Sequence, residues 1–361
     1  MKIKPVISTI LIFLSATLLW SCQEEYHVDL QNTEPFLVVD GLLTDQQGPH
    51  EVRLSKSVKF QDQFIPQAVS GASLRITVSD GQSVPLTETQ PGVYQTPANF
   101  EGIIGRSYVL HITAQNGEEY VSAPQTLMPP LSIDSVFGQL GEEIFYLHSQ
   151  VSNNVYPTAV DGTNTFLKTS GTNEDASSYR FVSELYLQYL IIYGGIGGAV
   201  ETVDNCWIRR QINDQLGTDL GNRNLMQNAT DKIGFVLRER NQLPYYGFTE
   251  QLYQSHRVLI NKIFTLNEDS YEFHKAKNEQ LSDEGRFFDP IAAQIQGNMQ
   301  CITDPQKVVL GLFEASSELI ITYKIESDFQ NNTVDITMID NLHTIPRSGC
   351  LYEEYPDHWL F

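Results

Sequence analysis

Short stretches of alternating apolar and polar residues, separated by turn sequences, most strongly limit how the first third of this chain can fold. Successive side chains of a strand point to opposite faces, so Leu74, Ile76 and Val78 share one face. Turn signals such as Asp80-Gly81 and Asn116-Gly117 separate the stretches. Several short strands at this spacing are typical of a β-sandwich. We therefore expect a mainly β protein whose residues 35–128 form an Ig-like β-sandwich, with strands at 36–43, 50–58, 72–79, 84–88, 92–96 and 106–114.

Two consecutive prolines mark the clearest boundary in the chain. Pro129 and Pro130 lack backbone N–H donors and restrict the residue before them, so neither a central strand nor a helix continues through them. A larger β-rich domain with one helical crossover is expected over residues 131–361. In it, the polar segment 152–178 predicts a long loop or an irregular hairpin. Strands are expected at 132–137, 179–193, 255–265, 307–313 and 318–324.

The clearest helix signal covers residues 267–281. Asn267 is a good N-cap, because its side-chain oxygen can accept a hydrogen bond from a free backbone N–H of the first turn. Acidic residues follow directly, and Lys275 and Lys277 lie further along, as the helix dipole favours. We expect this helix to pack against a sheet.

The N-terminus has the features of a secretory signal. Residues 2–4 include two lysines, and residues 6–20 form an apolar run that is too short for a comfortable membrane span. Leu19 and Ser21 precede Cys22 in an arrangement that resembles the bacterial lipobox. The alternative is a soluble secreted protein in which Cys22 is an ordinary thiol.

The residues around Cys22 predict where the protein is located. We expect residues 1–21 to be removed, Cys22 to hold the protein to the membrane through its acyl chains, and residues 22–34 to form a tether. Gln23, Glu24 and Glu25 follow the lipidation site and resemble the export signal that places lipoproteins of Bacteroidetes on the cell surface. The expected location is the outer membrane, facing the cell exterior.

The charge of the chain excludes one large class of partner. Asp and Glu number 44 against 23 Lys and Arg, a net charge of −21, and removal of Lys2 and Lys4 with the signal gives −23. Nucleic-acid binding requires clustered Lys and Arg to meet the phosphates, and the sequence contains no such run. We therefore expect no nucleic-acid partner.

The remaining cysteines are odd in number. With Cys22 lipidated, Cys206, Cys301 and Cys350 are left in an oxidising compartment, so one pair and one free thiol are expected. We favour a disulfide between Cys301 and Cys350, although all three pairings are open. No CxxC motif indicates a structural zinc site.

The common catalytic signatures are absent from the sequence. There is no GxSxG, HExxH, phosphate loop or EF-hand loop. The glycines within 194–198 lack the spacing of a dinucleotide loop, and no capped helix follows them. Glu284 and Asp289 could perform acid–base chemistry if they converged, but such charges are usually solvated. We expect no enzymatic activity, no cofactor and no metal site, with a hydrolase as the alternative.

Aromatic residues are the best candidates for contacts with a ligand or partner. Tyr193, Tyr245, Tyr246 and Phe248 lie near glycine-rich or loop segments. Exposed rings give large contact areas at a small entropic cost. The alternative is that these rings belong to the core of a sheet.

A short motif at Ser135 suggests a modification. Asp134, Ser135 and Val136 follow an Asp-Ser/Thr-apolar pattern that resembles an O-glycosylation site of Bacteroidetes. Ser135 is therefore a candidate for O-glycosylation.

Several short motifs are spread along the mature chain. They are FLVVDGLLTD (36–45), VSGA (69–72), PGVY (91–94), GRSYVLHI (105–112), IDSV (133–136), FDP (288–290), QGN (296–298), VLGLFEAS (309–316) and PDHW (356–359). Together they resemble one family, the Bacteroidetes lipoproteins catalogued as domain of unknown function 4249, and the resemblance covers nearly the whole mature chain. Members of the family often carry two nearby cysteines close to the C-terminus, where this chain has Cys350 alone, which leaves the disulfide pairing open.

The resemblance implies a partner and no reaction. Members of this family resemble surface lipoproteins that occur with TonB-dependent outer-membrane receptors, and the family offers no catalytic residues to transfer. We therefore expect an accessory protein of a TonB-dependent transporter that captures a ligand or hands it on. The alternative is a non-enzymatic structural or assembly protein of the envelope.

Overall fold

The computed structural model describes residues 35–57, 66–148, 155–169, 178–194, 200–211, 219–222, 230–237, 250–282, 295 and 297–339. The chain divides into two units at Phe36, and the first, Met1–Pro35, contributes only Pro35 to the described part. All elements given below belong to the second unit, Phe36–Phe361. The protein is mainly β, as predicted, with one helix among the described residues.

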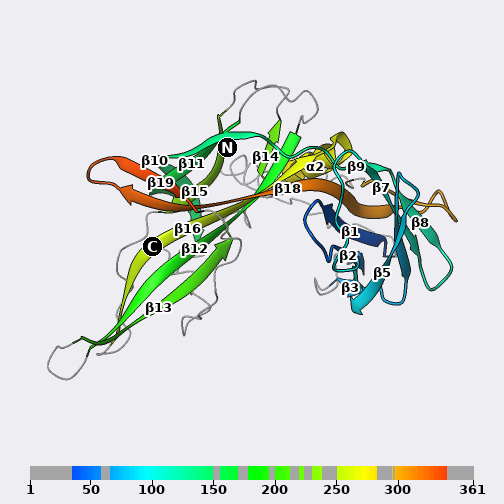
Figure 1. The fold of residues 1–361 in the computed structure, drawn as a ribbon, viewed down its shortest axis with the longest axis horizontal. Coiled ribbons are helices and arrows are strands. Elements are labelled where there is room, and N and C mark those ends of the chain that lie inside the picture. Colours follow the sequence, from blue (N-terminus) through cyan, green and yellow to red (C-terminus); the bar gives the residue numbers. More distant parts are fainter. Residues whose placement is uncertain are drawn as a thin grey trace, which may run out of the picture. The chain divides into compact units, whose positions relative to one another are not determined.

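The N-terminal part is an Ig-like β-sandwich whose two sheets share a strand. The first sheet has the order β18-β1-β2-β6-β5 and the second β5-β4-β7-β8-β17. Figure 1 labels β1, β2 and β5 of the first sheet and β7 and β8 of the second. The first half of β5 pairs with β4 and its second half with β6, so this strand passes from one sheet to the other. The strands are β1 (Leu37–Thr44), β2 (Glu51–Lys56), β3 (Gln67–Ala68), β4 (Ser73–Val78), β5 (Ser83–Gln90), β6 (Val93–Gln95), β7 (Ser107–Thr113), β8 (Glu119–Ser122) and β9 (Gln125–Thr126).

The core of the sandwich follows the predicted alternation. Leu74, Ile76 and Val78 of β4 are all buried, and their neighbours Leu110 and Ile112 on β7 join the same hydrophobic cluster. Each strand contributes one face to this cluster, which is the arrangement that a two-sheet sandwich requires. The strand pattern expected from the sequence is confirmed here.

Two strands from the last quarter of the chain also belong to the sandwich. β17 (Met299–Cys301) pairs antiparallel with β8. β18 (Val309–Asp328) pairs parallel with β1, from Leu37 opposite Val309 to Thr44 opposite Ser316. The sequence does not predict these pairings, because alternation shows which face of a strand is buried but not which distant strand lies beside it.

The junction between β1 and β18 depends on close backbone approach. Gly311 has a φ of 91°, and a Cβ at this position would overlap the carbonyl oxygen of Val39. A Cβ at Gly297 would in turn overlap the carbonyl oxygen of Gly311. Beside it, the Asn298 side chain bonds the backbone of Phe313 twice, donating to its carbonyl at 2.7 Å and accepting from its N–H at 3.0 Å. Glycine is thus required where three segments meet.

Two further sheets form the second part of the fold. One has the order β13-β12-β16-β18-β19, with β14 beside β12, and the other has the order β10-β11-β15. Their facing side chains, including Tyr179, Leu259 and Tyr323 from the first and Leu167 and Ile233 from the second, form a separate hydrophobic cluster. The strands are β10 (Ile133–His148), β11 (Val155–Thr169), β12 (Ser178–Gly194), β13 (Val200–Gln211), β14 (Asp219–Asn222), β15 (Thr230–Leu237), β16 (Glu250–Leu266) and β19 (Thr333–Met338).

Along the chain, membership passes from the first hydrophobic cluster to the second near the predicted boundary at Pro129 and Pro130. Leu127 belongs to the sandwich cluster and Leu131 to the second, with Pro129 and Pro130 between them. β18, however, contributes Phe313 to the first cluster and residues from Ile321 onward to the second. One strand therefore passes through both cores (Figure 1).

The predicted helix is confirmed as α2 (Glu268–Ser282). Asn267 is its N-cap, because its Oδ1 accepts a hydrogen bond from the N–H of Ser270 at 3.0 Å. The described residues contain no helix that is long and apolar enough to cross a membrane.

Two segments differ from the sequence expectation. The polar segment 152–178 contains β11, which forms a hairpin with β10, so the hairpin interpretation is correct. The two strands expected at 307–313 and 318–324 are one strand, β18. The residues between them include the polar side chains of Glu314, Ser316 and Ser317, which are buried within the sheet instead of forming a turn.

Candidate functional site

Most residues that the sequence singles out for function lie outside the described part of the chain. This holds for the lipidation and export residues, for three of the four aromatic candidates, for one cysteine and for the acid–base pair. These residues are Cys22, Gln23, Glu24, Glu25, Tyr245, Tyr246, Phe248, Glu284, Asp289 and Cys350.

Two other candidates lie on described strands. Tyr193 is near the end of β12, where its backbone is opposite Thr202 of β13 and Glu250 of β16. Ser135 is exposed on β10, and the neighbouring Asp134 forms an ion pair with Lys168 at 3.1 Å. The position of Ser135 leaves its hydroxyl accessible from solvent.

The predicted disulfide receives no support from the structure. Cys301 is a free thiol, buried in the sandwich core, with its sulfur 3.4 Å from the hydroxyl of Thr303. Cys301 is the last residue of β17, and the sequence does not show that its side chain faces the core. Buried thiols behave as small apolar side chains.

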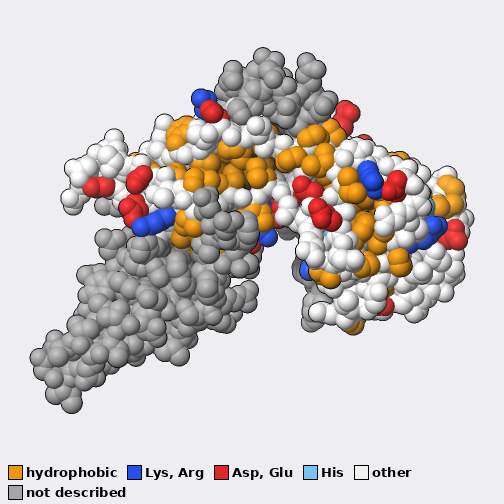
Figure 2. Space-filling model, in the orientation of Figure 1, with side chains coloured by type: hydrophobic (Ala, Val, Ile, Leu, Met, Phe, Trp, Pro, Cys, Tyr) orange, Lys and Arg blue, Asp and Glu red, His pale blue; other side chains and the backbone are white. Residues whose placement is uncertain are grey.

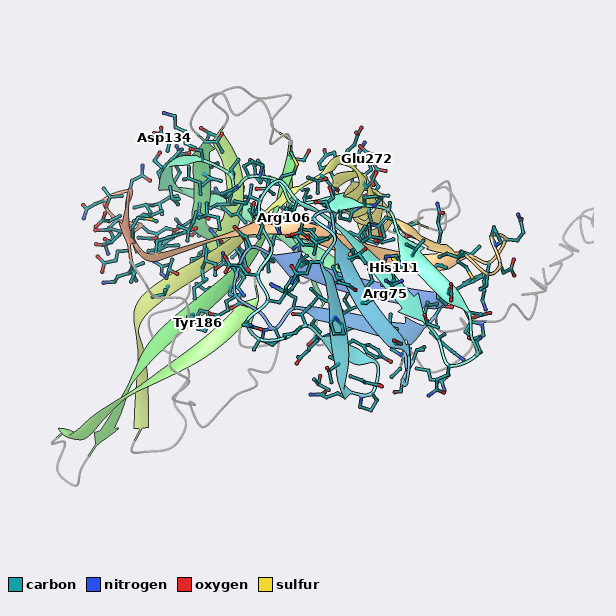
Figure 3. The ribbon with its side chains drawn as sticks, turned by 45° about the vertical axis from the view of Figure 1, so that its right-hand side comes forward. Arg75, Arg106, His111, Asp134, Tyr186 and Glu272 are labelled. Atoms are coloured by element: carbon teal, nitrogen blue, oxygen red, sulfur yellow. The ribbon has the colours of Figure 1, made fainter. Side chains whose placement is uncertain are left out.

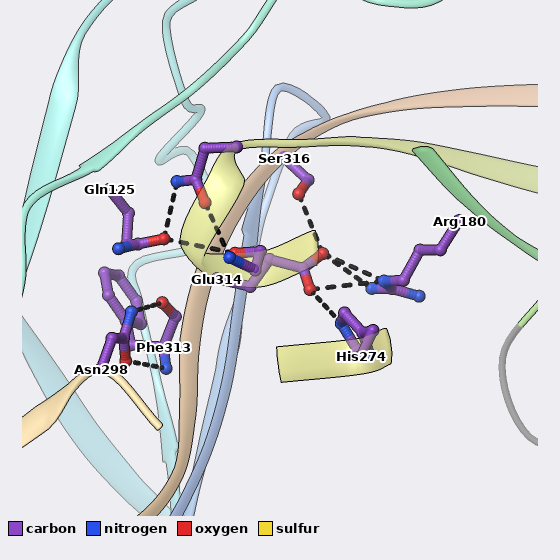
Figure 4. Close-up of polar contacts among 9 residues, drawn as sticks. Gln125, Arg180, His274, Asn298, Phe313, Glu314 and Ser316 are labelled. Atoms are coloured by element: carbon purple, nitrogen blue, oxygen red, sulfur yellow. Dashed lines mark hydrogen bonds and ion pairs between the residues drawn. The ribbon is translucent and has the colours of Figure 1, made fainter. Parts of the chain in front are cut away.

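The most developed polar cluster is centred on a carboxylate that the sequence analysis does not single out. Glu314 of β18 is 3 % exposed. Arg180 of β12 donates to its Oε1 from Nη2 at 2.9 Å and from Nε at 3.1 Å (Figure 4). His274 of α2 lies 2.7 Å from Oε2, and the hydroxyl of Ser316 donates to Oε1 at 2.9 Å. A carboxylate can only accept, so Nε2 of His274 carries the hydrogen in this contact.

The charge of Glu314 is stabilised by its partners. Burial by itself would raise the pKa of the carboxyl group, but the attraction of Arg180 and the hydrogen bond from His274 outweigh burial and lower the pKa to about 2. Arg180 also stacks over the ring of Phe264, 3.9 Å from its centre. Glu314 is therefore ionised in the folded protein.

A second set of hydrogen bonds holds the N-terminus of α2. Gln125, fully buried on β9, accepts hydrogen bonds from Asn267 at 2.7 Å and from the hydroxyl of Ser270 at 3.2 Å (Figure 4). The helix is thus attached to the sandwich at its first turn and to β18 and β12 through His274. The cluster joins elements of both hydrophobic cores.

The carboxylate of Glu314 is not accessible to a ligand from solvent. Both carboxylate oxygens accept hydrogen bonds from protein side chains, and the group is shielded from solvent. Among the described residues, no set of three or more His, Cys, Asp or Glu side chains is arranged to hold a metal ion. The arrangement fits a structural connection between elements, in which both oxygens of Glu314 are occupied. Nδ1 of His274 is buried and has no hydrogen-bond partner.

Ion pairs elsewhere in the described part include one within a single element, Glu272 with Lys275, and one between neighbouring strands, Asp134 with Lys168. Figure 3 shows Asp134 on β10 and Glu272 on α2, with no second labelled group pointing toward either. Arg75 and His111 are opposite each other on β4 and β7, where burial and then the charge of Arg75 lower the pKa of His111. Lys and Arg side chains are scattered over the face in Figure 2.

The sequence does mark Glu314 as unusual, although the alternation of apolar and polar residues does not explain its role. Glu314 is an acidic residue within an otherwise apolar run, VLGLFEAS, and a buried acid requires a cationic partner. The sequence cannot name Arg180 and His274, because they lie 134 and 40 residues away. Asn298 and Glu314 both belong to motifs that carry the family resemblance, and both bind other segments of the fold.

Comparison with known proteins gives one family and no individual relatives. The sequence model described as domain of unknown function (DUF4249) matches residues 23–320, most of the chain. Neither the curated proteins nor the solved structures contain a significant match.

Proposed function

Because the chain belongs to the DUF4249 family, we propose that it is a lipid-anchored outer-membrane protein that works with a TonB-dependent transporter. In this proposal Cys22 carries the lipid, and Gln23, Glu24 and Glu25 direct the protein to the cell exterior. The protein then captures a ligand or hands it to the transporter.

The observation that carries the proposal lies at the N-terminus. An apolar run ends at Cys22, and the family match begins at residue 23, immediately after this cysteine. The match therefore starts one residue after Cys22, the first residue of the mature chain in this proposal. Two or more acyl chains on one cysteine suffice for stable anchoring.

A binding role is favoured over a catalytic one by the chemistry of the described residues. Their most buried carboxylate, Glu314, is saturated by Arg180, His274 and Ser316. Long paired strands such as β12 and β16 extend toward the aromatic candidate Tyr193. Rigid strands that present residues at their ends are suited to recognition of a ligand or partner.

The proposal is tested by affinity purification of the full, lipidated protein from native outer membranes in mild detergent, followed by mass spectrometry. We expect a TonB-dependent receptor in near-equal amount. The Cys22→Ser variant, which has no acylation site, is the matched control and should recover much less receptor from membranes. Recovery of no receptor with the wild-type protein would contradict the proposal.

The aromatic candidates allow a second test of ligand handling. Tyr245→Ala combined with Tyr246→Ala should reduce transporter-dependent uptake while the amount of protein at the surface stays unchanged. Ile104→Ala, which alters an exposed apolar residue of the sandwich, is the control. Unchanged uptake of every nutrient tested would remove these rings from the proposed site.

A structural role in the envelope is the second candidate. The observation in its favour is β18, a 20-residue strand that contributes to both cores and suits a stiff spacer. A deletion strain with an envelope defect on all nutrients, together with recovery of assembly factors in place of a receptor, would favour this role.

A further inference from the structure

The outer face of one sandwich sheet carries an arginine without a counter-charge. Side chains alternate along β4, so Arg75 faces solvent while its two neighbours in the strand pack in the core. The other arginines of the sandwich, Arg53 and Arg106, form ion pairs with Glu51 and Asp80. Arg75 has no such partner among the described residues, although Asp and Glu number 44 in this chain.

A histidine faces the same side of the sheet directly beside this arginine. His111 of β7 lies opposite Arg75 in the antiparallel pairing of β7 with β4, and both side chains are labelled in Figure 3. Side chains that are opposite each other in a sheet have Cβ atoms about 5 Å apart. Nε2 of His111 lies 3.0 Å from the hydroxyl of Thr77, which orients the ring. Nδ1 of His111 has no partner among the described residues and is the nitrogen left for another group.

The positions around Arg75 carry hydroxyl groups and no acid. Strand pairing defines seven neighbours of Arg75 on this face, of which four are serine or threonine. The first acidic residue beyond them on the strands paired here is Glu119, which lies opposite Thr113 on β8. The seven neighbours are Ser73, Thr77, Ser83, Pro85, Val109, His111 and Thr113.

The electrostatics of the pair lack a negative partner. Burial and then the charge of Arg75 lower the pKa of His111, and no carboxylate opposes these two effects. A negative group beside both side chains would attract the guanidinium and would favour the protonated imidazole. Binding of an anion and binding of a proton by His111 would therefore strengthen each other.

The residue types define the class of group that fits. A guanidinium donates two parallel hydrogen bonds to the oxygens of a carboxylate, a phosphate or a sulfate. Protonated imidazole donates from both nitrogens, and serine and threonine hydroxyls donate as well. The surface around Arg75 thus offers donors from three strands and presents no carboxylate of its own.

We infer that the outer face of β4 and β7 binds an anionic oxygen group, a phosphate, sulfate or carboxylate, between Arg75 and His111. In the bound state the guanidinium of Arg75 holds two oxygens of the group, and Nδ1 of His111 donates another hydrogen bond to it. The site is made by the sandwich alone and does not depend on the transporter.

The test is equilibrium dialysis of the full, lipidated protein in neutral detergent against radiolabelled sulfate. Arg75→Ala should lower the affinity for sulfate by about tenfold or more, because it removes charge-assisted hydrogen bonds. Arg53→Ala is the matched control, since it removes an arginine of the same sandwich that is already paired with Glu51, and it should leave the affinity unchanged.

The role of His111 has its own readout. The charge of sulfate is constant between about pH 7.5 and pH 5.5, where histidine gains its proton. The affinity of the wild type should rise by about fivefold over this range. His111→Gln, which keeps a hydrogen-bonding side chain beside Thr77 but does not titrate, should show no such rise.

Acetate, dialysed in parallel, separates the sources of the anionic group. Stronger binding of sulfate supports a ligand that carries phosphate or sulfate, and stronger binding of acetate supports one that carries a carboxylate. Absence of saturable binding of either anion, equal affinities of the Arg75→Ala and wild-type proteins, or an affinity of the wild type that does not change with pH would overturn the site. None of these results bears on recovery of the receptor, which tests the proposed function.

Discussion

At the scale of single residues, Glu314 connects parts of the fold that no local pattern joins. Its carboxylate holds Arg180 of β12, His274 of α2 and Ser316 of its own strand. Breaking a buried pair is costly, because the charge that remains has no partner and no water. The stability of the protein should therefore depend strongly on this one side chain.

We expect Glu314→Gln to lower the free energy of unfolding by about 3–5 kcal/mol, since Arg180 stays buried without a counter-charge. Urea unfolding of both proteins measures the difference. Glu272→Gln removes an exposed pair with Lys275 and should cost less than about 1 kcal/mol. Equal effects of the two substitutions would show that the buried cluster is not a main source of stability.

The same residue predicts a dependence on pH. The pKa of Glu314 is lowered from 4.5 to about 2 in the folded protein, so the stability it provides is fully present above the unfolded value. This stability is lost as the pH falls from about 5 toward 2, because the unfolded chain then binds a proton that the folded one does not. Thermal unfolding at a series of pH values should show a steeper loss for the wild type than for Glu314→Gln. Parallel curves would refute this assignment.

At the scale of elements, the sequence predicts the helices and strands that are marked by capping residues or by alternation of apolar and polar residues. The N-cap Asn267 and the acidic first turn predict α2 within one residue of its observed start, and alternation predicts β4 and β7. The sequence misses the continuity of β18, because its buried polar residues look like a turn. It also misses the pairing of β18 with β1, since partner choice depends on contacts far apart in the chain.

The contribution of the N-cap Asn267 to stability can be measured with a single substitution. Asn267→Ala removes the hydrogen bond to the N–H of Ser270 and the contact with Gln125, and should destabilise the protein by about 1–2 kcal/mol. Lys277→Ala, an exposed change within the same helix, should have little effect. Chemical denaturation compares the two, and a cap substitution as mild as the control would mean that α2 is held mainly by His274.

The junction of β1 and β18 offers a matched pair of glycine substitutions. Gly311→Ala places a Cβ against the carbonyl oxygen of Val39 at a φ of 91°, whereas Gly117→Ala has a similar φ of 84° with nothing within 4 Å. The second change should cost about 1–2 kcal/mol for its backbone conformation alone. The first should cost more by at least about 2 kcal/mol, because the two strands must separate. Similar melting temperatures for the two variants would contradict this account of the junction.

At the scale of the whole molecule, the sequence predicts a mainly β protein and its family, and both are confirmed. The candidate site is predicted less completely. Of the four aromatic contact candidates, Tyr193 alone lies on a described strand, and Glu314 is recognised only once Arg180 and His274 are seen beside it. Chemistry that depends on residues brought together from distant segments cannot be read from spacing.

The proposed lipid anchor at Cys22 gives a prediction for the whole molecule. Cys22→Ser should move the protein from the membrane pellet to the soluble fraction, because no other lipidation site is expected and two acyl chains supply most of the membrane affinity. Fractionation followed by immunoblotting measures the change. The Cys206→Ser variant should stay in the pellet, and a pelleted Cys22→Ser variant would contradict lipid anchoring.

The pairing of β1 with β18 also orders events during synthesis of the chain. Leu37 lies opposite Val309, so 272 positions (309 − 37) separate two strands that are neighbours in one sheet. The chain emerges from the ribosome with its N-terminus first. The sandwich therefore lacks β17 and β18 until the last quarter of the polypeptide has emerged. Contacts of such long sequence separation form slowly. The first strand of the chain to be synthesised is thus among the last to receive its full set of neighbours.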